Sequence, residues 1–440
     1  MTARPQADAD GTDHALDAGP LGFDGSVPSR GKRAFRALRH REFRLVWSTF
    51  MVGQFGFWIA FIALQALMSR LTDANGMWLG VLFFVNFSPM LVFTPIAGVV
   101  ADRIERKQIV IAAYSVLTVL MTGLAVVTLT DHATPLTLLP FAFGIGTVFS
   151  FNAPANHSII ANAVPRVDFP SAISLQSAGG NLSRVVGPTL AAPVLAVWGE
   201  GAAFAVYAAT SLMVVLLMRR VHISGYEPEH DDGRFWSRVK RGLQHARERP
   251  PAMAVLSVLV MSSLFAAAYL ALLPVMADQV FDRGPTGFAT LAAVAGFGSM
   301  LGALSSAFRD TMPTLRSVSL LVAGFGASIV AFALVPTWTL TMPAIVVTGF
   351  FYFSGMTTLN TLLQYLATEN MRGRISSLFV IGWAGLVPIG GLWQGLLANT
   401  WGVRPTMALA GSVTAAYGLG IAIVLGGRKV RRPVMQGATS

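Results

Sequence analysis

The chain is organised as long apolar runs that alternate with short polar segments. A helix needs about 20 predominantly apolar residues to cross the hydrocarbon core of a bilayer, and twelve runs approach or exceed that length. Glycine and proline recur inside the runs, as transmembrane helices tolerate. The pattern therefore predicts an all-α membrane protein with twelve transmembrane helices. The approximate runs are residues 45–69, 77–100, 108–130, 134–157, 170–198, 201–218, 252–277, 286–308, 317–336, 340–365, 376–399 and 403–427.

The longest polar segment falls between the sixth and seventh runs and divides them into two groups of six. The groups are weakly repetitive, because the segment from Asn156 to Arg166 after the fourth run has a counterpart from Asn360 to Arg372 after the tenth. Two related six-helix halves with a site near the bilayer midplane are a transporter arrangement. We therefore predict two pseudo-symmetric halves. The expected boundaries are a disordered cytoplasmic tail with a basic juxtamembrane end at 1–40, halves at 41–218 and 252–427, a cytoplasmic central loop at 219–251 and a cytoplasmic tail at 428–440.

Composition agrees with a membrane protein. Hydrophobic residues make up 54% of the chain and charged residues 12%, whereas soluble domains carry about 25% charged residues. The chain has no cysteine, which excludes disulfides, thiolate catalysis and cysteine metal sites. It has no cluster of His, Asp or Glu with metal or nucleophile spacing, and no Walker lysine motif. We therefore expect no metal, no cofactor and no ATP hydrolysis, and a polytopic membrane enzyme is a disfavoured alternative.

The 32 Lys and Arg residues are distributed unevenly between the two sides of the predicted membrane. Almost all lie in the tails and in the loops after even-numbered runs, while the opposite loops hold only Arg70, Arg283 and Arg404. Cytoplasmic loops carry an excess of Lys and Arg, so both termini are predicted to be cytoplasmic. The net charge of +11 therefore reports orientation, and we expect no nucleic-acid partner.

Arg184 is the one Lys or Arg deep inside a run. A cation at that depth is costly and usually faces a polar cavity or a partner. Gly187 and Pro188 follow it closely and weaken the helix, and a charge beside a helix defect indicates a transport pathway. Arg184 either contacts an anionic or carbonyl group of a substrate, or gates a central cavity. The alternative is a structural cation bonded to carbonyl groups of a neighbouring helix near Asn152.

Other polar and aromatic residues inside the runs are candidates for the wall of a central cavity. Each polar one has an alternative role as an interhelical hydrogen-bond partner. No Asp or Glu lies deep in a run, although proton coupling usually needs a titratable group in the pathway, so protons are only a candidate coupling ion. Besides Arg184, the candidate cavity residues are Gln54, Trp58, Asn86, Asn152, Asn156, Asn181, Tyr352 and Trp383.

The turn after the second run contains Gly98 and the charged residues Asp102, Arg103, Arg106 and Lys107. A small residue lets two helix ends approach, and the charges close the hairpin, so this cluster can act as a latch at the cytoplasmic face. An ordinary positive-inside loop is the alternative. The pattern resembles the signature between the second and third helices of the major facilitator superfamily, although an acidic residue stands where that signature has its second glycine.

Two further segments resemble one branch of that superfamily, which contains the enterobactin exporter and macrolide-efflux proteins. The turn after the tenth run reads Arg372-Gly373-Arg374, as in that branch, and Gly187-Pro188 resembles the helix-packing motif in the fifth helix of superfamily exporters. The resemblance covers about residues 35–425. It implies the major facilitator fold, a packing role for the glycine-proline pair and a place in the latch for the Arg-Gly-Arg turn.

The resemblance also implies a secondary active exporter in the cytoplasmic (inner) membrane of a bacterium, working by alternating access. Its substrates would be amphipathic small molecules, either a siderophore or a macrolide-like drug. An attraction of Arg184 for anionic cargo would suit a catecholate or carboxylate siderophore better than a cationic drug. A lipid or metabolite permease of the same superfamily is the alternative. The expected partners are the small-molecule substrate and the lipid bilayer, and we expect a monomer.

Overall fold

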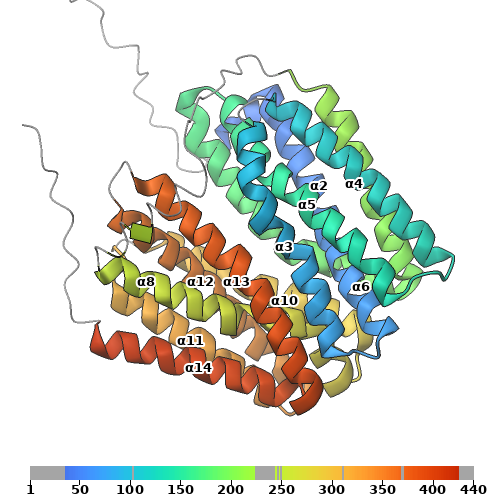
Figure 1. The fold of residues 1–440 in the computed structure, drawn as a ribbon. Helices are drawn as coiled ribbons and strands as arrows, with labels where there is room; N and C mark the ends of the chain where they lie inside the picture. The colour runs from blue at the N-terminus through green and yellow to red at the C-terminus, as the bar shows by residue number, and fades with distance from the viewer. Residues whose placement is uncertain are drawn as a thin grey trace, which may run out of the picture.

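The computed structural model describes residues 35–101, 104–222, 243–244, 247, 250–309, 312–367 and 371–425, and these residues are almost entirely helical, with no strand among them (Figure 1). The predicted all-α class is therefore confirmed. Most of both predicted tails and of the predicted central loop lies outside the described residues, so these boundaries stay predictions. The first half of the described chain contains the turns η1 (Arg36–Arg39) and η2 (Arg166–Asp168) and the helices α2 (Arg41–Leu71), α3 (Gly76–Ala101), α4 (Arg106–Leu129), α5 (Pro135–Asn162) and α6 (Phe169–Arg219).

Helix α6 comprises two membrane crossings. Its 51 residues would extend for about 77 Å if straight, far more than the roughly 30 Å thickness of a bilayer core. Gly199 breaks the helical geometry with φ 75° and ψ −176°, a conformation that glycine adopts without strain. Next to this break, Glu200 pairs with Arg70 at the end of α2, with Nε and Oε1 3.1 Å apart. The chain therefore turns back at Gly199.

Both ends of α6 lie beside the start of α2, which shows the same reversal. The backbone N–H of His222, just beyond α6, donates to Glu42 Oε2 at 2.7 Å. At the other end, the Asp168 carboxylate that precedes α6 meets the residues that precede α2. The described residues contain eleven helical segments long and apolar enough to span a membrane, and since α6 crosses twice, the predicted twelve crossings are confirmed.

The second half begins with an irregular crossing, Pro250–Val280. Its central part is not α-helical, because a π-helical turn at Ser262–Ala266 is followed by a 3₁₀ turn at Ala267–Leu272. The elements of this half are α8 (Pro250–Met261), η3 (Ser262–Ala266), η4 (Ala267–Leu272), α9 (Leu273–Val275), η5 (Met276–Val280), α10 (Gly284–Ala307), α11 (Leu315–Leu334), α12 (Trp338–Leu366), α13 (Arg372–Trp401) and α14 (Val403–Val424).

Side chains of α13 donate hydrogen bonds to carbonyl groups of this irregular turn. Gln394 Nε2 donates to the carbonyl oxygen of Phe265 at 2.6 Å and to that of Leu264 at 3.4 Å. Trp393 Nε1 donates to the same Leu264 oxygen at 3.2 Å. Unpaired backbone groups are costly inside a membrane and are tolerated only where protein or water satisfies them. The break in the seventh crossing therefore depends on α13, and the apolar run alone did not predict it.

The two halves meet along α3 with α13 and along α6 with α10 (Figure 1). At the beginning of α3, Gly76 and Gly80 face Gly395 and Gly391 of α13 so closely that a Cβ on Gly80 would lie 2.6 Å from the Gly391 carbonyl oxygen. Only glycine permits this approach. Because α3 starts where α2 ends, this contact lies at the membrane face opposite to the start of α2. Gln279 Nε2 adds a hydrogen bond across the same face to the carbonyl oxygen of Ala74 at 3.0 Å.

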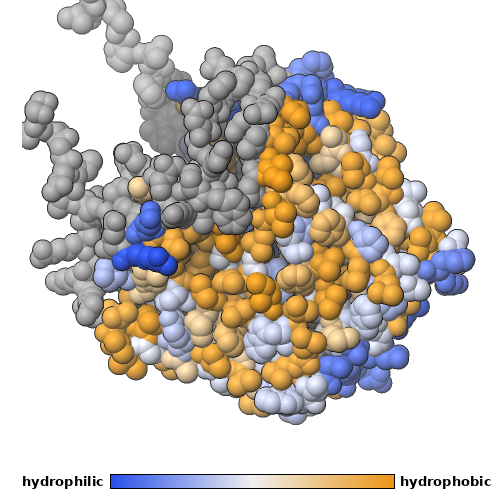
Figure 2. Space-filling model, viewed as in Figure 1, coloured by the Kyte–Doolittle hydropathy of each residue, from blue (hydrophilic) through white to orange (hydrophobic). Residues whose placement is uncertain are grey.

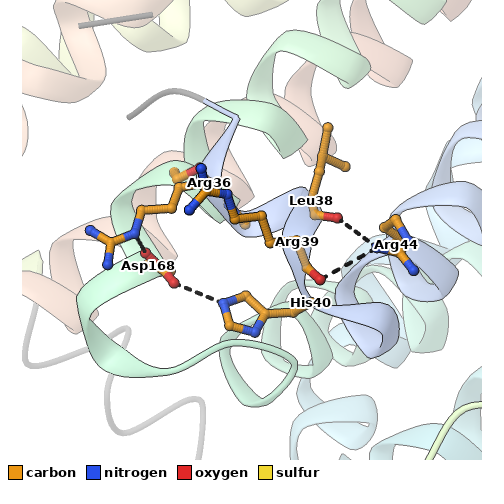
Figure 3. Close-up of polar contacts among 8 residues, drawn as sticks. Arg36, Leu38, Arg39, His40, Arg44 and Asp168 are labelled. Atoms are coloured by element: carbon orange, nitrogen blue, oxygen red, sulfur yellow. Dashed lines mark hydrogen bonds and ion pairs between the residues drawn. The ribbon is translucent and has the colours of Figure 1, made fainter. Parts of the chain in front are cut away.

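The segment before α2 is fixed against the start of α6, and we call residues 35–40 the N-terminal strap (Figure 3). Arg36 Nε lies 2.9 Å from Asp168 Oδ1, and His40 Nε2 donates to Asp168 Oδ2 at 2.8 Å. The N–H of Ala37 donates to Ser171 Oγ at 3.1 Å. The Asp168 side chain is only 6% exposed, so two basic partners are needed to offset the cost of burying its charge.

The outer surface of the helices is apolar. Figure 2 shows hydrophobic residues over most of one face, with hydrophilic residues gathered toward its edges. Large hydrophobic side chains such as Val119, Leu136 and Ile423 are 73%, 69% and 81% exposed. Soluble monomers rarely expose contiguous apolar patches beyond a few hundred Å², so this surface is suited to contact with lipid.

Candidate functional site

A cavity of about 290 Å³ lies between the two halves. This volume is at the lower limit of pockets that hold drug-sized ligands, which run from about 300 to 1,000 Å³. Side chains of α2, α3, α5 and α6 form one wall, and side chains of η4, α9, α10, α12 and α13 form the other. The irregular part of the seventh crossing contributes Tyr269 and Leu270. A site shared in this way changes shape whenever the halves move relative to each other.

The wall supplied by the first half is aromatic. Phe57 stacks on Phe61 with ring centroids 5.9 Å apart and on Phe149 at 5.5 Å. Phe83 and Phe87 of α3 add a tilted pair at 4.8 Å. All five side chains line the cavity. Such a surface offers apolar contact and ring stacking, which suits the apolar part of an amphipathic ligand.

Arg184 is the only charged residue in the described lining of the cavity. Its guanidinium carbon lies 4.9 Å from the ring centroid of Phe353 on α12, a cation–π contact that joins the two halves. Among the described residues no carboxylate or carbonyl oxygen accepts a hydrogen bond from this guanidinium. The sequence-based alternative of a cation bonded to carbonyl groups near Asn152 therefore has no contact that supports it in the described part of the chain.

The opposite wall presents a hydrogen-bonded aromatic pair. Trp383 Nε1 donates to the Tyr352 hydroxyl oxygen at 3.1 Å. Because the indole can only donate, the hydroxyl hydrogen of Tyr352 stays available for another acceptor. Tyr352 also packs on Phe325, with ring centroids 5.3 Å apart, and on Tyr269 at 6.4 Å. These contacts hold the phenol at a fixed position in the lining of the cavity that Arg184 shares.

The glycine-proline pair lies behind this site. Gly187 faces Trp58 of α2, and a Cβ on it would lie 2.9 Å from Trp58 Cγ. The missing side chain therefore lets the indole of a cavity residue lie directly on α6. Helical geometry continues through Pro188, and the only residue of α6 with non-helical geometry is Gly199. The weakened helix expected at Gly187-Pro188 is thus a place of close packing, while the bend occurs eleven residues later at the turn.

Some of the predicted site residues line the cavity and others do not. Five of the nine candidates line it, and the other four are absent from its described lining. Asn156 Nδ2 donates to Asn152 Oδ1 at 2.8 Å, an i,i+4 pair along α5 that satisfies part of both amides. The candidates in the lining are Gln54, Trp58, Arg184, Tyr352 and Trp383, and those outside it are Asn86, Asn152, Asn156 and Asn181.

Several lining residues were not predicted, among them Phe61, Phe83, Phe87 and Tyr269. The spacing of Phe57, Trp58 and Phe61 places three aromatic residues on adjoining positions of one helix face, and this was a usable signal. The sequence held no such signal for Tyr269, because the position of this residue depends on the irregular turns η3 and η4.

The predicted latch falls mostly outside the described part of the chain. Asp102 and Arg103 are not described, nor are the side chains of Gly98, Arg372, Gly373 and Arg374, so the latch stays a prediction. Arg106 begins α4. Next to it, Lys107 Nζ donates to the carbonyl oxygen of Val221 at 2.7 Å. This bond ties the start of α4 to the end of α6 within the first half.

Comparison with known proteins gives a consistent result over most of the chain. Residues 32–436 match the family described as transmembrane secretion effector. The staphyloferrin A transporter of Staphylococcus aureus is 23% identical over 82% of this chain and 90% of its own length. Macrolide efflux protein A of Streptococcus pyogenes is 24% identical over 85% of this chain and 95% of its own length. The match therefore extends over both halves.

Solved structures share the same fold. The nucleoside transporter NupG superposes with a TM-score of 0.66 at 15% identity, covering 88% of this chain and all of that one. A bacterial homologue of the lysosomal transporter Spinster gives a TM-score of 0.67 at 16% identity, covering 90% and 98% of the two chains. At this level of identity the likeness concerns the arrangement of helices, and it confirms the expected major facilitator fold.

Proposed function

Because the chain belongs to the transmembrane secretion effector family of the major facilitator superfamily, we propose that it is a secondary active exporter of amphipathic small molecules in the bacterial cytoplasmic membrane. The observation that carries this proposal is the cavity between the two halves, whose described lining combines an aromatic wall with a single cation, Arg184, on the same first half. An amphipathic molecule matches both features. The relatives named staphyloferrin A transporter and macrolide efflux protein A support an exporter of small molecules.

Alternating access would proceed by rocking the halves about this cavity. The glycine contacts between α3 and α13 close the face opposite to the start of α2. With both termini in the cytoplasm, as the distribution of Lys and Arg predicts, the closed face is the outer one. We therefore infer that this conformation receives substrate from the cytoplasm and that release requires α3 and α13 to separate.

No Asp or Glu is present in the described lining of the cavity, so a proton carried between substrate-binding groups is not supported there. We propose that a coupling proton, if protons drive transport, binds at a group outside this lining. We further propose a monomer, because each chain already supplies both walls of the cavity.

The test of this function is metabolite profiling of cells and medium with and without the gene. We expect one small molecule to disappear from the medium and accumulate inside the deletion strain, and re-expression of the wild-type chain to reverse both changes. An unchanged medium, under conditions where the protein is made and reaches the membrane, would contradict export.

The direction of substrate flux distinguishes an exporter from the alternative, a lipid or metabolite permease. Inverted membrane vesicles expose the cytoplasmic face to the assay medium. An exporter accumulates the identified compound inside such vesicles when they are energised, whereas an uptake permease does not. Net movement in the uptake direction in right-side-out vesicles would favour the permease.

A further inference from the structure

Several hydrogen-bond donors that line the cavity have no acceptor among the described residues. Arg184 offers its guanidinium N–H groups, and no described residue accepts from them. Trp58 Nε1 is buried without an acceptor in the described part of the chain. The Tyr352 hydroxyl already accepts from Trp383, so its own hydrogen is the group left to bind. No carboxylate is present in the described lining to balance these donors.

We propose that the substrate carries an anionic oxygen group of the carboxylate class, bound between Arg184 and the hydroxyl of Tyr352, with its apolar body on the aromatic wall. This inference rests on the proposed function and specifies its substrate class. A guanidinium at membrane depth without a hydrogen-bond acceptor is costly, and an oxyanion removes that cost while accepting charge-assisted hydrogen bonds. A ligand whose only charge is an ammonium group meets a like charge and a set of donors that it cannot satisfy.

The proposed anion site joins the two halves of the protein. Arg184 belongs to α6 and already contacts Phe353, the neighbour of Tyr352 on α12. An anion that binds both residues therefore adds an attraction across the interface through which the halves rock. The apolar body would contact the stacked rings of Phe57, Phe61 and Phe149 on the first half. The charged end thus determines the orientation of the substrate.

Trp383 acts as a positioning residue in this arrangement. Its indole N–H occupies one lone pair of the Tyr352 oxygen at 3.1 Å, which directs the hydroxyl hydrogen away from the indole. Removing the indole N–H leaves the aromatic wall intact but frees the hydroxyl to rotate. The preference for an anion should therefore weaken while the contribution of the apolar body persists.

The experiment compares three probes that share one ring system and differ in charge: 2-naphthoate, 2-naphthamide and 2-naphthylmethylammonium. Binding to the purified full-length protein in lipid nanodiscs is measured by isothermal titration calorimetry, with empty nanodiscs subtracted. We expect the carboxylate to bind at least about tenfold more tightly than the amide, as expected for a hydrogen bond to a charged group. The ammonium probe should show no saturable binding. Equal affinities, or tighter binding of the ammonium probe, would overturn the proposal.

Single-residue variants test which side chains cause the preference for the carboxylate probe. Arg184→Gln should remove the preference for the carboxylate over the amide, Arg184→Lys should keep part of it, and Trp383→Phe should reduce it without weakening amide binding. Arg404→Gln is the matched control, because Arg404 also lies over an aromatic ring, that of Phe281 at 5.8 Å, but outside the cavity lining. An unchanged preference in Arg184→Gln would refute the assignment. If Arg184→Gln does not fold, the three probes are compared on Tyr352→Phe and on the wild-type protein. These comparisons still decide whether the cavity prefers an anion.

The proposed substrate class and the proposed export function can fail independently of each other. Export of a neutral or cationic compound, identified by metabolite profiling and abolished by Arg184→Lys, would overturn the anionic class and leave an exporter. Carboxylate-selective binding by a protein that moves nothing in cells or vesicles would support the anion site and contradict export.

Discussion

The contact between Gly80 and Gly391 provides a direct test of how the outer face closes. In Gly80→Ala the added Cβ would lie 2.6 Å from the Gly391 carbonyl oxygen and 3.2 Å from Leu392 Cα. These are backbone atoms of α13, so no side-chain rotation relieves the overlap. The two helices must move apart, and the conformation in which they touch is the one that loses stability.

The size of the effect follows from the cost of overpacking. One extra methyl group in a well-packed contact costs about 1–3 kcal/mol. A difference of that size changes the ratio of two conformations by roughly 5- to 150-fold. In the proposed mechanism α3 and α13 separate when the outer face opens, so the whole cost falls on the outward-closed state. Gly80→Ala should therefore raise the outward-open population by a factor in that range.

The assay uses the absence of native cysteine. A cysteine is introduced at Ala292, which lines the cavity, and intact cells are treated with a membrane-impermeant maleimide. We expect slow labelling in the parent protein and markedly faster labelling after Gly80→Ala. Gly420→Ala is the control, because a Cβ at Gly420 meets nothing within 4 Å. Unchanged labelling of a correctly inserted Gly80→Ala protein, or an equal increase in Gly420→Ala, would refute the reasoning.

Two further predictions concern stability. Gln394→Leu removes the side-chain donor to the Phe265 carbonyl oxygen, so we expect the free energy of unfolding in detergent to fall by about 1–2 kcal/mol. The control is Gln108→Leu at an exposed position, which should change the free energy of unfolding little. Equal effects of the two substitutions would contradict a special role for the irregular crossing. Asp168→Asn removes the negative charge that holds both basic partners of the N-terminal strap, so trypsin should cleave the strap faster than in the wild type. Asp131→Asn, at an exposed turn, is the control, and unchanged cleavage in Asp168→Asn would show that the strap is held by other contacts.

Individual residues show where sequence-based prediction of the site stops. Arg184 was identifiable because a charge inside an apolar run is expensive wherever the helix packs. Asn152 and Asn156 had the same polar character as Gln54, yet only Gln54 lines the cavity. Which face of a helix points inward is determined by packing against neighbours distant in sequence, and apolar positions facing lipid and protein interior look alike in a membrane helix.

The sequence by itself determined the number of crossings and the two-half organisation, because a bilayer requires each crossing to satisfy its own backbone hydrogen bonds over a fixed length. These are local requirements, and each run meets them by itself except in the irregular part of the seventh crossing. The tertiary structure alone decided that the seventh crossing is irregular, since Gln394 and Trp393 of a distant helix satisfy its carbonyl groups. It also decided that α6 stays helical through Pro188, whereas the turn at Gly199 falls between the predicted runs 170–198 and 201–218. Finally, it brought Arg184, Tyr352 and the aromatic wall together, because a cavity between two halves exists only once both have folded and met.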